Sequence, residues 1–140
     1  MRPRIVGALF FCLAAVFSSS AQADLQACVE KLIDAPGSAQ ARVCLAHEVE
    51  QREKVLTKLE RAIESGIRKQ SKFDLPPTLQ SFREAQVAWR KYRRTNCWID
   101  ASQATNADAV QYMCEATLAD CRIPQLENIL ACLEGESCGA

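Results

Sequence analysis

One predicted helix carries a glutamine, a tryptophan, an arginine and a cysteine on the same side. These residues are Gln86, Trp89, Arg93 and Cys97, which follow one another at intervals of three or four positions. With Phe82, they fall within about 80° of one another at 100° per residue. Burying a guanidinium costs free energy unless it is paired and fully hydrogen-bonded. We therefore expect a carboxylate from another helix to meet the arginine.

The expected partner lies on a long helix predicted over about residues 39–69. Its apolar stripe is interrupted by Glu48 and, one turn later, Arg52. We predict that Glu48 and Arg93 approach across the helix interface, and that Gln86 bonds a nearby backbone group. Arg52 can pair with Glu48 along its own helix. The alternative is that Arg93 lies at a shallow edge and reaches water. In either arrangement, the role of these residues is to fix the register between the helices, and neither arrangement indicates catalysis.

No catalytic or metal-binding motif accompanies this structural polar network. The sequence has no G-x-S-x-G, no Gly-rich phosphate loop and no H-E-x-x-H. The single histidine, His47, is expected at the surface, and no two cysteines have the C-x-x-C spacing of redox or zinc sites. We therefore predict a protein that is not an enzyme and uses no metal or cofactor.

The elements that position these residues are all expected to be helices. Helix-forming residues dominate, and glycine and β-branched residues are scarce. Four helices are predicted, over about residues 25–34, 39–69, 78–101 and 107–133. Pro76-Pro77 and a polar turn over residues 102–106 separate the later helices, and Pro124 is expected to kink or split the last one. The predicted fold is all-α: a disulfide-stapled up-and-down bundle of three main helices plus a short N-terminal helix.

The N-terminus has the pattern of a secretory signal peptide. A positive start precedes the apolar run Ile5–Phe17, and a small-x-small sequence ends at Ala23. The run is too short for a comfortable bilayer span. We expect residues 1–23 to be removed together with Cys12. Residues 24–140 would then form a single domain in the periplasm or outside the cell, with no membrane span.

The charge balance argues against a nucleic-acid partner. Removal of two of the 17 basic residues would leave 15 against 17 acidic side chains, a net charge of about −2. Three arginines, Arg83, Arg90 and Arg94, form a ridge beside the Arg93 side of their helix, and we expect that ridge to be a solvated face. The composition thus excludes a generic nucleic-acid binder and does not specify an oligomeric state.

The helix with the polar stripe also carries a family resemblance. The chain reads Ala85-Gln86-x-Ala88-Trp89-x-x-Tyr92-Arg93-x-x-x-Cys97, with Leu79 before it. This resembles the core signature of the LprI-type lysozyme-inhibitor domain family. Further matching positions are Cys44, Leu45, Leu56, Cys114, Arg122 and Leu126. The resemblance spans roughly residues 28–130 and implies a helical protein that binds lysozyme, in which Trp89 and Tyr92 are motif aromatics.

Three features mark the chain as a divergent member of that family. Arg94 occupies a position where an aspartate is common. The second helix has Glu53, Leu56, Thr57 and Glu60 where family members often read Asp-x-x-Leu-Asn-x-x-Tyr. Residues 101–109 contain no glycine, although a Gly-Ser stretch commonly precedes the later cysteine. The Gln-Trp-Arg-Cys stripe is retained, so the expected fold is unchanged.

Two disulfides are expected at the bends of the bundle. In the resemblance, Cys97 and Cys114 belong together, which fits antiparallel helices joined by a short turn. Closing this loop should contribute about 3 kcal/mol in the chain-entropy model. Cys28 and Cys44 bracket the turn at residues 35–37 in the same way and form the second pair.

The remaining cysteines leave two pairings open. Cleavage after the signal peptide would leave seven cysteines, so at least one is expected to be free or to pair between chains. We place Cys132 with Cys138 through a small C-terminal loop, which leaves Cys121 free. The alternative joins Cys121 to Cys138 and leaves Cys132 over.

The functional hypothesis is an exported helical binding protein that blocks a lysozyme-type cell-wall hydrolase. Such enzymes work in a cleft with two carboxylates, into which an inhibitor could insert a cationic or hydrogen-bonding side chain. The candidate interface is Trp98, Ser102, Gln103, Thr105 and Asn106, and the loop over residues 69–77 is a second candidate. A tryptophan at a helix end is a plausible interface anchor, although Trp98 could instead cover the short N-terminal helix. The alternative functions are a structural or assembly module of the bacterial cell envelope without lysozyme contact, and a thiol-reactive partner that uses the unpaired cysteine.

Overall fold

The computed structural model describes residues 19–70 and 78–135, all in helices and the turns between them. The helices are α1 Ser19–Asp34, α2 Ala39–Gln70, α3 Leu79–Ala101 and α4 Ala107–Leu133. The predicted all-α class is therefore confirmed. The first helix begins at Ser19 rather than near Leu25, because the alanines and glutamine before Leu25 also favour helix.

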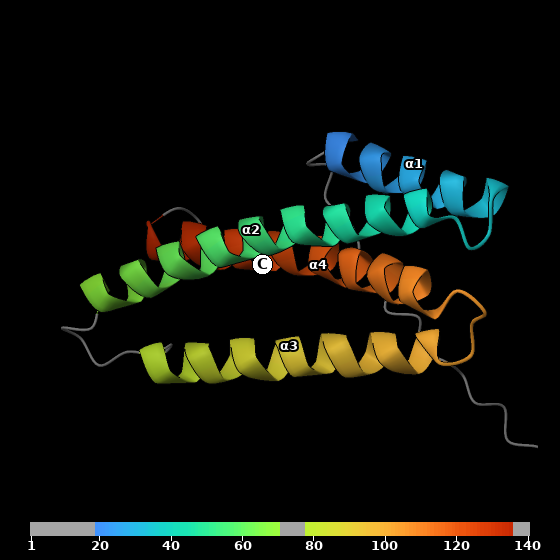
Figure 1. Cartoon of the computed structure of the whole chain (residues 1–140). Coiled ribbons are helices and arrows are strands. Elements are labelled where there is room, and N and C mark those ends of the chain that lie inside the picture. Colours follow the sequence, from blue (N-terminus) through green and yellow to red (C-terminus); the bar gives the residue numbers. More distant parts are fainter. Residues whose placement is uncertain (1–18, 71–77, 136–140) are drawn as a thin grey trace, which may run out of the picture.

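The four helices run alternately in opposite directions, so that α2 and α4 point the same way (Figure 1). The most extensive packing is between α2 and α4. The first helix packs on α2 and α4, whereas α3 packs mainly on α4 and touches α2 along a narrower line. Figure 1 places α1 and α3 on opposite sides of the central α2–α4 pair. The outer face of α3 is therefore left uncovered by the other described helices.

Short polar residues and one glycine form the turns. Ser38 directly precedes α2, and its hydroxyl caps that helix by accepting a hydrogen bond from the Ala41 backbone N–H at 3.4 Å. Thr78 caps α3 by accepting from the Ser81 N–H at 3.1 Å. Gly37 has a φ of +85°, which a residue with a β-carbon rarely adopts.

The core divides into two hydrophobic clusters on either side of the bundle's middle. The larger joins α2, α3 and α4 through Leu56, Ile63, Ile67, Phe82, Ala119 and Leu126. The smaller joins α1, α2 and α4 through Cys28, Leu45 and Ala109. Polar side chains of α2 lie between them, including Arg52, which is only 3% exposed. The interruption of the apolar stripe noted in the sequence is therefore a buried polar layer.

Pro124 does not split the fourth helix. It lies inside α4, which continues to Leu133 as one helix. Proline removes one backbone donor and crowds the preceding turn. However, Ala119 and Leu126 on either side of it are fully buried. Packing of both halves against α2 and α3 compensates for the lost hydrogen bond, since tertiary packing supplies most helix stability in proteins.

Two disulfides staple the helices as predicted. Cys28–Cys44 joins α1 to α2, and Cys97–Cys114 joins α3 to α4. The Cα atoms lie 5.5 Å apart in each pair, an ordinary separation for a disulfide. Each staple therefore sits near a bend between antiparallel helices.

The prediction of a free thiol at Cys121 is wrong for this structure. Cys121 and Cys132 are both disulfide-bonded. The prediction counted the seven cysteines of a chain cleaved after Ala23, whereas the structure is of the full chain, which has eight. Cys138 lies outside the described residues, and so does the predicted Cys132–Cys138 pair. The hypothesis of a thiol-reactive partner concerns a chain cleaved after Ala23, which would keep seven cysteines, and it stays a prediction for that form.

None of the helices in the described ranges combines the length and hydropathy that a bilayer span requires. The predicted signal peptide, except for the residues that begin α1, lies outside the described part of the chain, and so do residues 71–77 of the second candidate interface.

Candidate functional site

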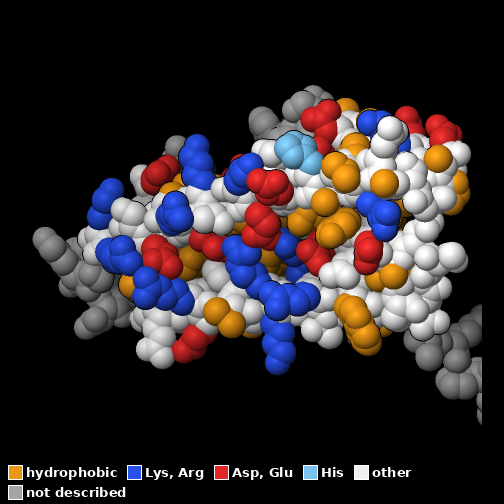
Figure 2. Space-filling view, viewed as in Figure 1, with side chains coloured by type: hydrophobic (Ala, Val, Ile, Leu, Met, Phe, Trp, Pro, Cys, Tyr) orange, Lys and Arg blue, Asp and Glu red, His pale blue; other side chains and the backbone are white. Residues whose placement is uncertain are grey.

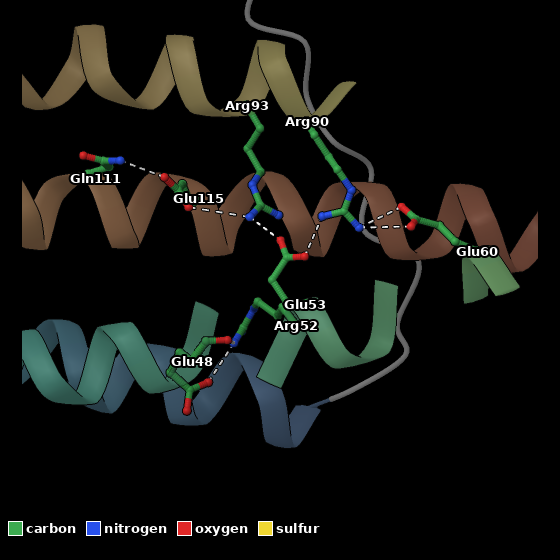
Figure 3. Close-up of polar contacts among 8 residues, drawn as sticks. All are labelled: Glu48, Arg52, Glu53, Glu60, Arg90, Arg93, Gln111 and Glu115. Atoms are coloured by element: carbon green, nitrogen blue, oxygen red, sulfur yellow. Dashed lines mark hydrogen bonds and ion pairs between the residues drawn. The ribbon is translucent and has the colours of Figure 1, made fainter. Parts of the chain in front are cut away.

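The buried arginine of α3 meets a carboxylate, but not the predicted one. Arg93 is 7% exposed and donates from Nη2 to Glu53 of α2. A second carboxylate, Glu115 of α4, lies 3.6 Å from the same nitrogen. Figure 3 shows the Glu53 carboxylate between Arg93 and Arg90, with Glu115 on the other side of Arg93. The ion pair expected from the sequence is thus present with different partners.

Glu48 pairs within its own helix instead. Its Oε2 accepts from Arg52 Nη1 at 2.7 Å, and Arg52 also binds Asp120 of α4 from Nε and Nη2, at 2.7 and 3.0 Å. Five residues separate Glu48 from Glu53, which is about 140° around a helix. The two side chains therefore leave opposite flanks of the buried stripe, and only the Glu53 flank faces α3. The predicted Glu48–Arg93 contact is wrong for this reason, whereas the Glu48–Arg52 pair is present.

A row of ion pairs, here called the Glu–Arg ladder, joins α2 to α3. Its members are Glu53, Glu60 and Glu64 of α2 and Arg83, Arg90 and Arg93 of α3. Arg90 binds Glu53 at 2.6 Å and Glu60 at 3.0 Å, and Arg83 binds Glu64 at 2.8 Å. Figure 2 shows basic and acidic side chains interleaved along this seam. Arg83 and Arg90, which were expected on a solvated face, therefore connect α3 to α2.

The ladder favours the ionised form of two of its carboxylates, Glu53 and Glu64. Burial alone would raise the pKa of Glu53, but the hydrogen bonds and positive charges of Arg90 and Arg93 outweigh burial and lower it. The hydrogen bond from Arg83, together with its charge, lowers the pKa of Glu64. The seam is charged at neutral pH and aligns α3 against α2.

Gln86 bonds a side chain rather than the predicted backbone group. Its Oε1 accepts from Nη2 of Arg122, on α4, at 3.2 Å. The guanidinium of Arg122 also lies 5.6 Å from the centre of the Trp89 ring, and that of Arg93 lies 5.1 Å from it. Trp89 is therefore in contact range of two cations, a favourable arrangement for an indole ring. The residues of the sequence stripe thus hold α3 on α4 and α2, which is a structural role.

The outward face of α3 carries exposed apolar side chains. Trp98 is 63% exposed and Ile99 55%. Because α1 packs on α2 and α4, Trp98 does not cover the N-terminal helix, and that alternative is wrong. The motif aromatic Tyr92 is also exposed, unlike Trp89.

The turn between α3 and α4 follows directly from Trp98. The Ser102 N–H donates to the Trp98 carbonyl at 2.9 Å, and the Ser102 hydroxyl donates to the Ile99 carbonyl at 2.7 Å. Gln103 and Thr105 are exposed, whereas Asn106 is half-buried. Asn106 starts α4 without capping it through its side chain. The structure therefore brings four of the five candidate interface residues to one exposed helix end, next to the Cys97–Cys114 staple.

Comparison with known families bears on this arrangement. A family model described as "Lysozyme inhibitor LprI" matches residues 28–126. The chain belongs to the LprI lysozyme-inhibitor family. No curated protein and no solved structure matches it. The matched segment of this LprI-family chain includes both described disulfides and the α2–α3 ladder. The family is named for inhibition of an enzyme and not for a reaction of its own.

One signal in the sequence could have identified the true partner of Arg93. Glu53 stands where LprI-family members often have the aspartate of Asp-x-x-Leu-Asn-x-x-Tyr, so a carboxylate is retained there. Glu115 and Asp120, the two α4 carboxylates of the polar layer, had no comparable signal. Their roles depend on how α4 is rotated against α2.

The described residues contain no cluster of side chains suited to bind a metal ion. Nowhere in the described ranges do three or more His, Cys, Asp or Glu side chains gather as a metal site would require. His47 is exposed and forms a hydrogen bond with Gln51 at 3.2 Å between side-chain nitrogens.

Proposed function

We propose that this LprI-family protein is exported, and that its mature form binds and blocks a lysozyme-type cell-wall hydrolase. The proposed mature chain is residues 24–140, a single domain that begins within α1. Export would place the chain in the periplasm or outside the cell, an oxidising setting in which disulfides such as Cys28–Cys44 and Cys97–Cys114 persist.

The observation that carries the proposal is a stripe on the exposed side of α3, here called the outer stripe. Its members are Val87, Lys91, Arg94 and Trp98, which recur at intervals of four, three and four residues. At 100° per residue they lie within about 60° of one another, and all four are exposed. A helix held at its C-terminal end by a disulfide thus presents a large aromatic ring and two cations on one side.

The cations of the outer stripe differ from the other basic residues of α3. Among the described residues, Lys91 and Arg94 form no ion pair, whereas Arg83, Arg90 and Arg93 all bind carboxylates of the bundle. The charges of Lys91 and Arg94 are therefore available to a partner. The cleft of a lysozyme-type hydrolase supplies two carboxylates, which suits a cationic insertion. The adjacent turn, with Ser102, Gln103 and Thr105, would add hydrogen bonds at the rim.

Trp98 is the proposed anchor. Tryptophan and arginine are enriched among interface residues whose truncation costs more than about 2 kcal/mol. Trp98 lies away from the buried face, so its replacement should not disturb the core. The proposal therefore predicts a large loss of binding from a single surface substitution.

The direct test is inhibition of a c-type lysozyme by the purified mature protein. We expect Trp98→Ala to raise the inhibition constant at least about 30-fold, equivalent to about 2 kcal/mol. The matched control is Tyr92→Ala, which removes an aromatic ring of similar exposure about 120° away on the same helix. Arg94→Asp should weaken inhibition as well. The absence of inhibition and of any complex at micromolar concentrations, or equal losses from Trp98→Ala and Tyr92→Ala, would contradict the proposal.

A further inference from the structure

A cavity of about 370 Å³ lies between the first turns of α3 and the last turns of α4. Most of its wall is apolar, with Phe82, Ile129 and Leu133 among the lining residues. Four polar side chains also line it: Ser81, Gln86, Arg122 and Asn128. The volume is at the lower end of the range for small-molecule sites. Gln86 and Trp98 are twelve residues apart on α3, about 18 Å, so the cavity is separate from the proposed hydrolase interface.

Arg122 is a half-buried cation for which the described part of the chain supplies no carboxylate. Its Nη1 donates to the Gln125 amide oxygen at 2.9 Å and its Nη2 to Gln86, both neutral groups. Its Nε is buried and has no hydrogen-bond partner. Burial lowers the pKa of Arg122, against a smaller opposing effect of the Glu60 charge. The buried arginines Arg52 and Arg93, by contrast, each bind two carboxylates.

A second unmet donor belongs to Gln86, another residue that lines the cavity. The residue is 6% exposed, and its Oε1 accepts from Arg122. Because a guanidinium can only donate, this bond fixes which end of the amide is oxygen. The Nε2 group is buried and has no acceptor in the structure. An unsatisfied buried donor costs about 1–3 kcal/mol, so such groups call for a ligand or another explanation.

We propose that this cavity binds a medium-chain fatty acid in its carboxylate form. The carboxylate head would accept hydrogen bonds from Arg122 and Gln86 and supply the missing negative charge. The chain would lie along Phe82, Ile129 and Leu133. A carboxylate matches the fork of a guanidinium, and such charge-assisted bonds are about twice as strong as neutral ones. A neutral amphiphile would fill the apolar part and leave the cation uncompensated.

The test uses the folded mature protein and three probes: octanoate, octanol and acetate. Octanoate has both head and chain, whereas octanol lacks the charge and acetate lacks the chain. We expect octanoate to bind with a Kd of about 1 mM or tighter, and at least tenfold more tightly than either other probe. In ¹H–¹⁵N spectra, the side-chain amide signals of Gln86 should shift on titration with octanoate. Equal affinity for octanoate and octanol, or shifts that spare Gln86, would overturn the proposal.

A pair of charge variants completes the test. Arg122→Met should reduce octanoate affinity to that of octanol, whereas Arg94→Met, which removes an exposed arginine of the outer stripe, should leave it unchanged. If Arg122→Met fails to fold, as judged by circular dichroism, the probe comparison and the Gln86 signals in the unsubstituted protein still decide the matter. Retention of octanoate affinity by a folded Arg122→Met variant would refute the assignment of the head group.

Discussion

Replacement of Glu53 by glutamine tests the ion-pair seam most sharply. The substitution keeps the shape of the side chain and removes its charge. Arg93 has a side chain only 9% exposed, and Glu115, 3.6 Å away, would be its one remaining carboxylate. Arg90 would keep Glu60 at 3.0 Å. The main loss is therefore the charge-assisted bond to the buried arginine.

The expected cost follows from these exposures. A hydrogen bond to a charged group contributes about 1.5–3 kcal/mol. The Glu53 side chain is 30% exposed, which screens the pair, and Glu115 compensates in part. We expect Glu53→Gln to lower the free energy of unfolding by about 2 kcal/mol. With a urea slope of about 1.5 kcal/mol/M, the midpoint should fall by about 1–1.5 M.

A control within the same ladder isolates the effect of burial. Glu64→Gln removes a carboxylate paired with Arg83, whose side chain is 53% exposed. Exposed pairs contribute about 0–1 kcal/mol, so this variant should lose about 0.5 kcal/mol. Equal losses from the two substitutions would refute the reasoning. A double-mutant cycle adds a second check, because Arg93 should couple to Glu53 and not to Glu48.

Two further predictions concern pH and the staple at the candidate interface. Arg90 and Arg93 hold the pKa of Glu53 below its ordinary 4.5 despite burial, so the stability from this group is present above about pH 4.5 and lost as pH falls through the folded-state pKa. The stability difference between wild type and Glu53→Gln, measured by urea unfolding, should therefore shrink at acidic pH, and a constant difference would contradict the pairing. Replacing Cys97 and Cys114 together by serine should lower the free energy of unfolding by about 3 kcal/mol; a loss under about 1 kcal/mol would show that the staple adds little.

Local features of this fold could be predicted from the sequence. The four helices follow from composition and from breakers such as Pro76-Pro77, and the Ser38 cap follows from its place before α2. The Cys28–Cys44 and Cys97–Cys114 pairs follow from cysteines that bracket short turns between antiparallel helices. The family resemblance, carried by the stripe on α3, is confirmed.

What the sequence could not supply is the rotation of each helix against its neighbours. Both Glu48 and Glu53 border the apolar stripe of α2, and a helical wheel does not say which flank faces α3. The same uncertainty concealed the roles of Arg83 and Arg90, which reach α2 and are not simply solvated. Long side chains at the edge of a stripe can join a neighbouring helix or water, and only the packed structure distinguishes the two.

The buried polar groups divide into those that the fold satisfies and those that it does not. Arg52 has both Glu48 and Asp120, which fixes α2 against α4. Arg122 and the Gln86 Nε2 group lack such partners among the described residues. Arg93 Nη1 is also buried without a hydrogen-bond partner, but the guanidinium of Arg93 pairs with Glu53 and Glu115. The lack of a carboxylate among the described residues therefore distinguishes Arg122, which is proposed to bind a ligand, from the arginines that join the helices.

The central claim is that the mature protein engages the substrate cleft of a lysozyme-type hydrolase. Calorimetric titration of a c-type lysozyme with residues 24–140, with and without a chitooligosaccharide bound in the cleft, tests it most directly. The proposed function predicts a one-to-one complex whose apparent affinity falls as the oligosaccharide concentration rises. A complex that is indifferent to the oligosaccharide, or no detectable heat at micromolar protein, would contradict it.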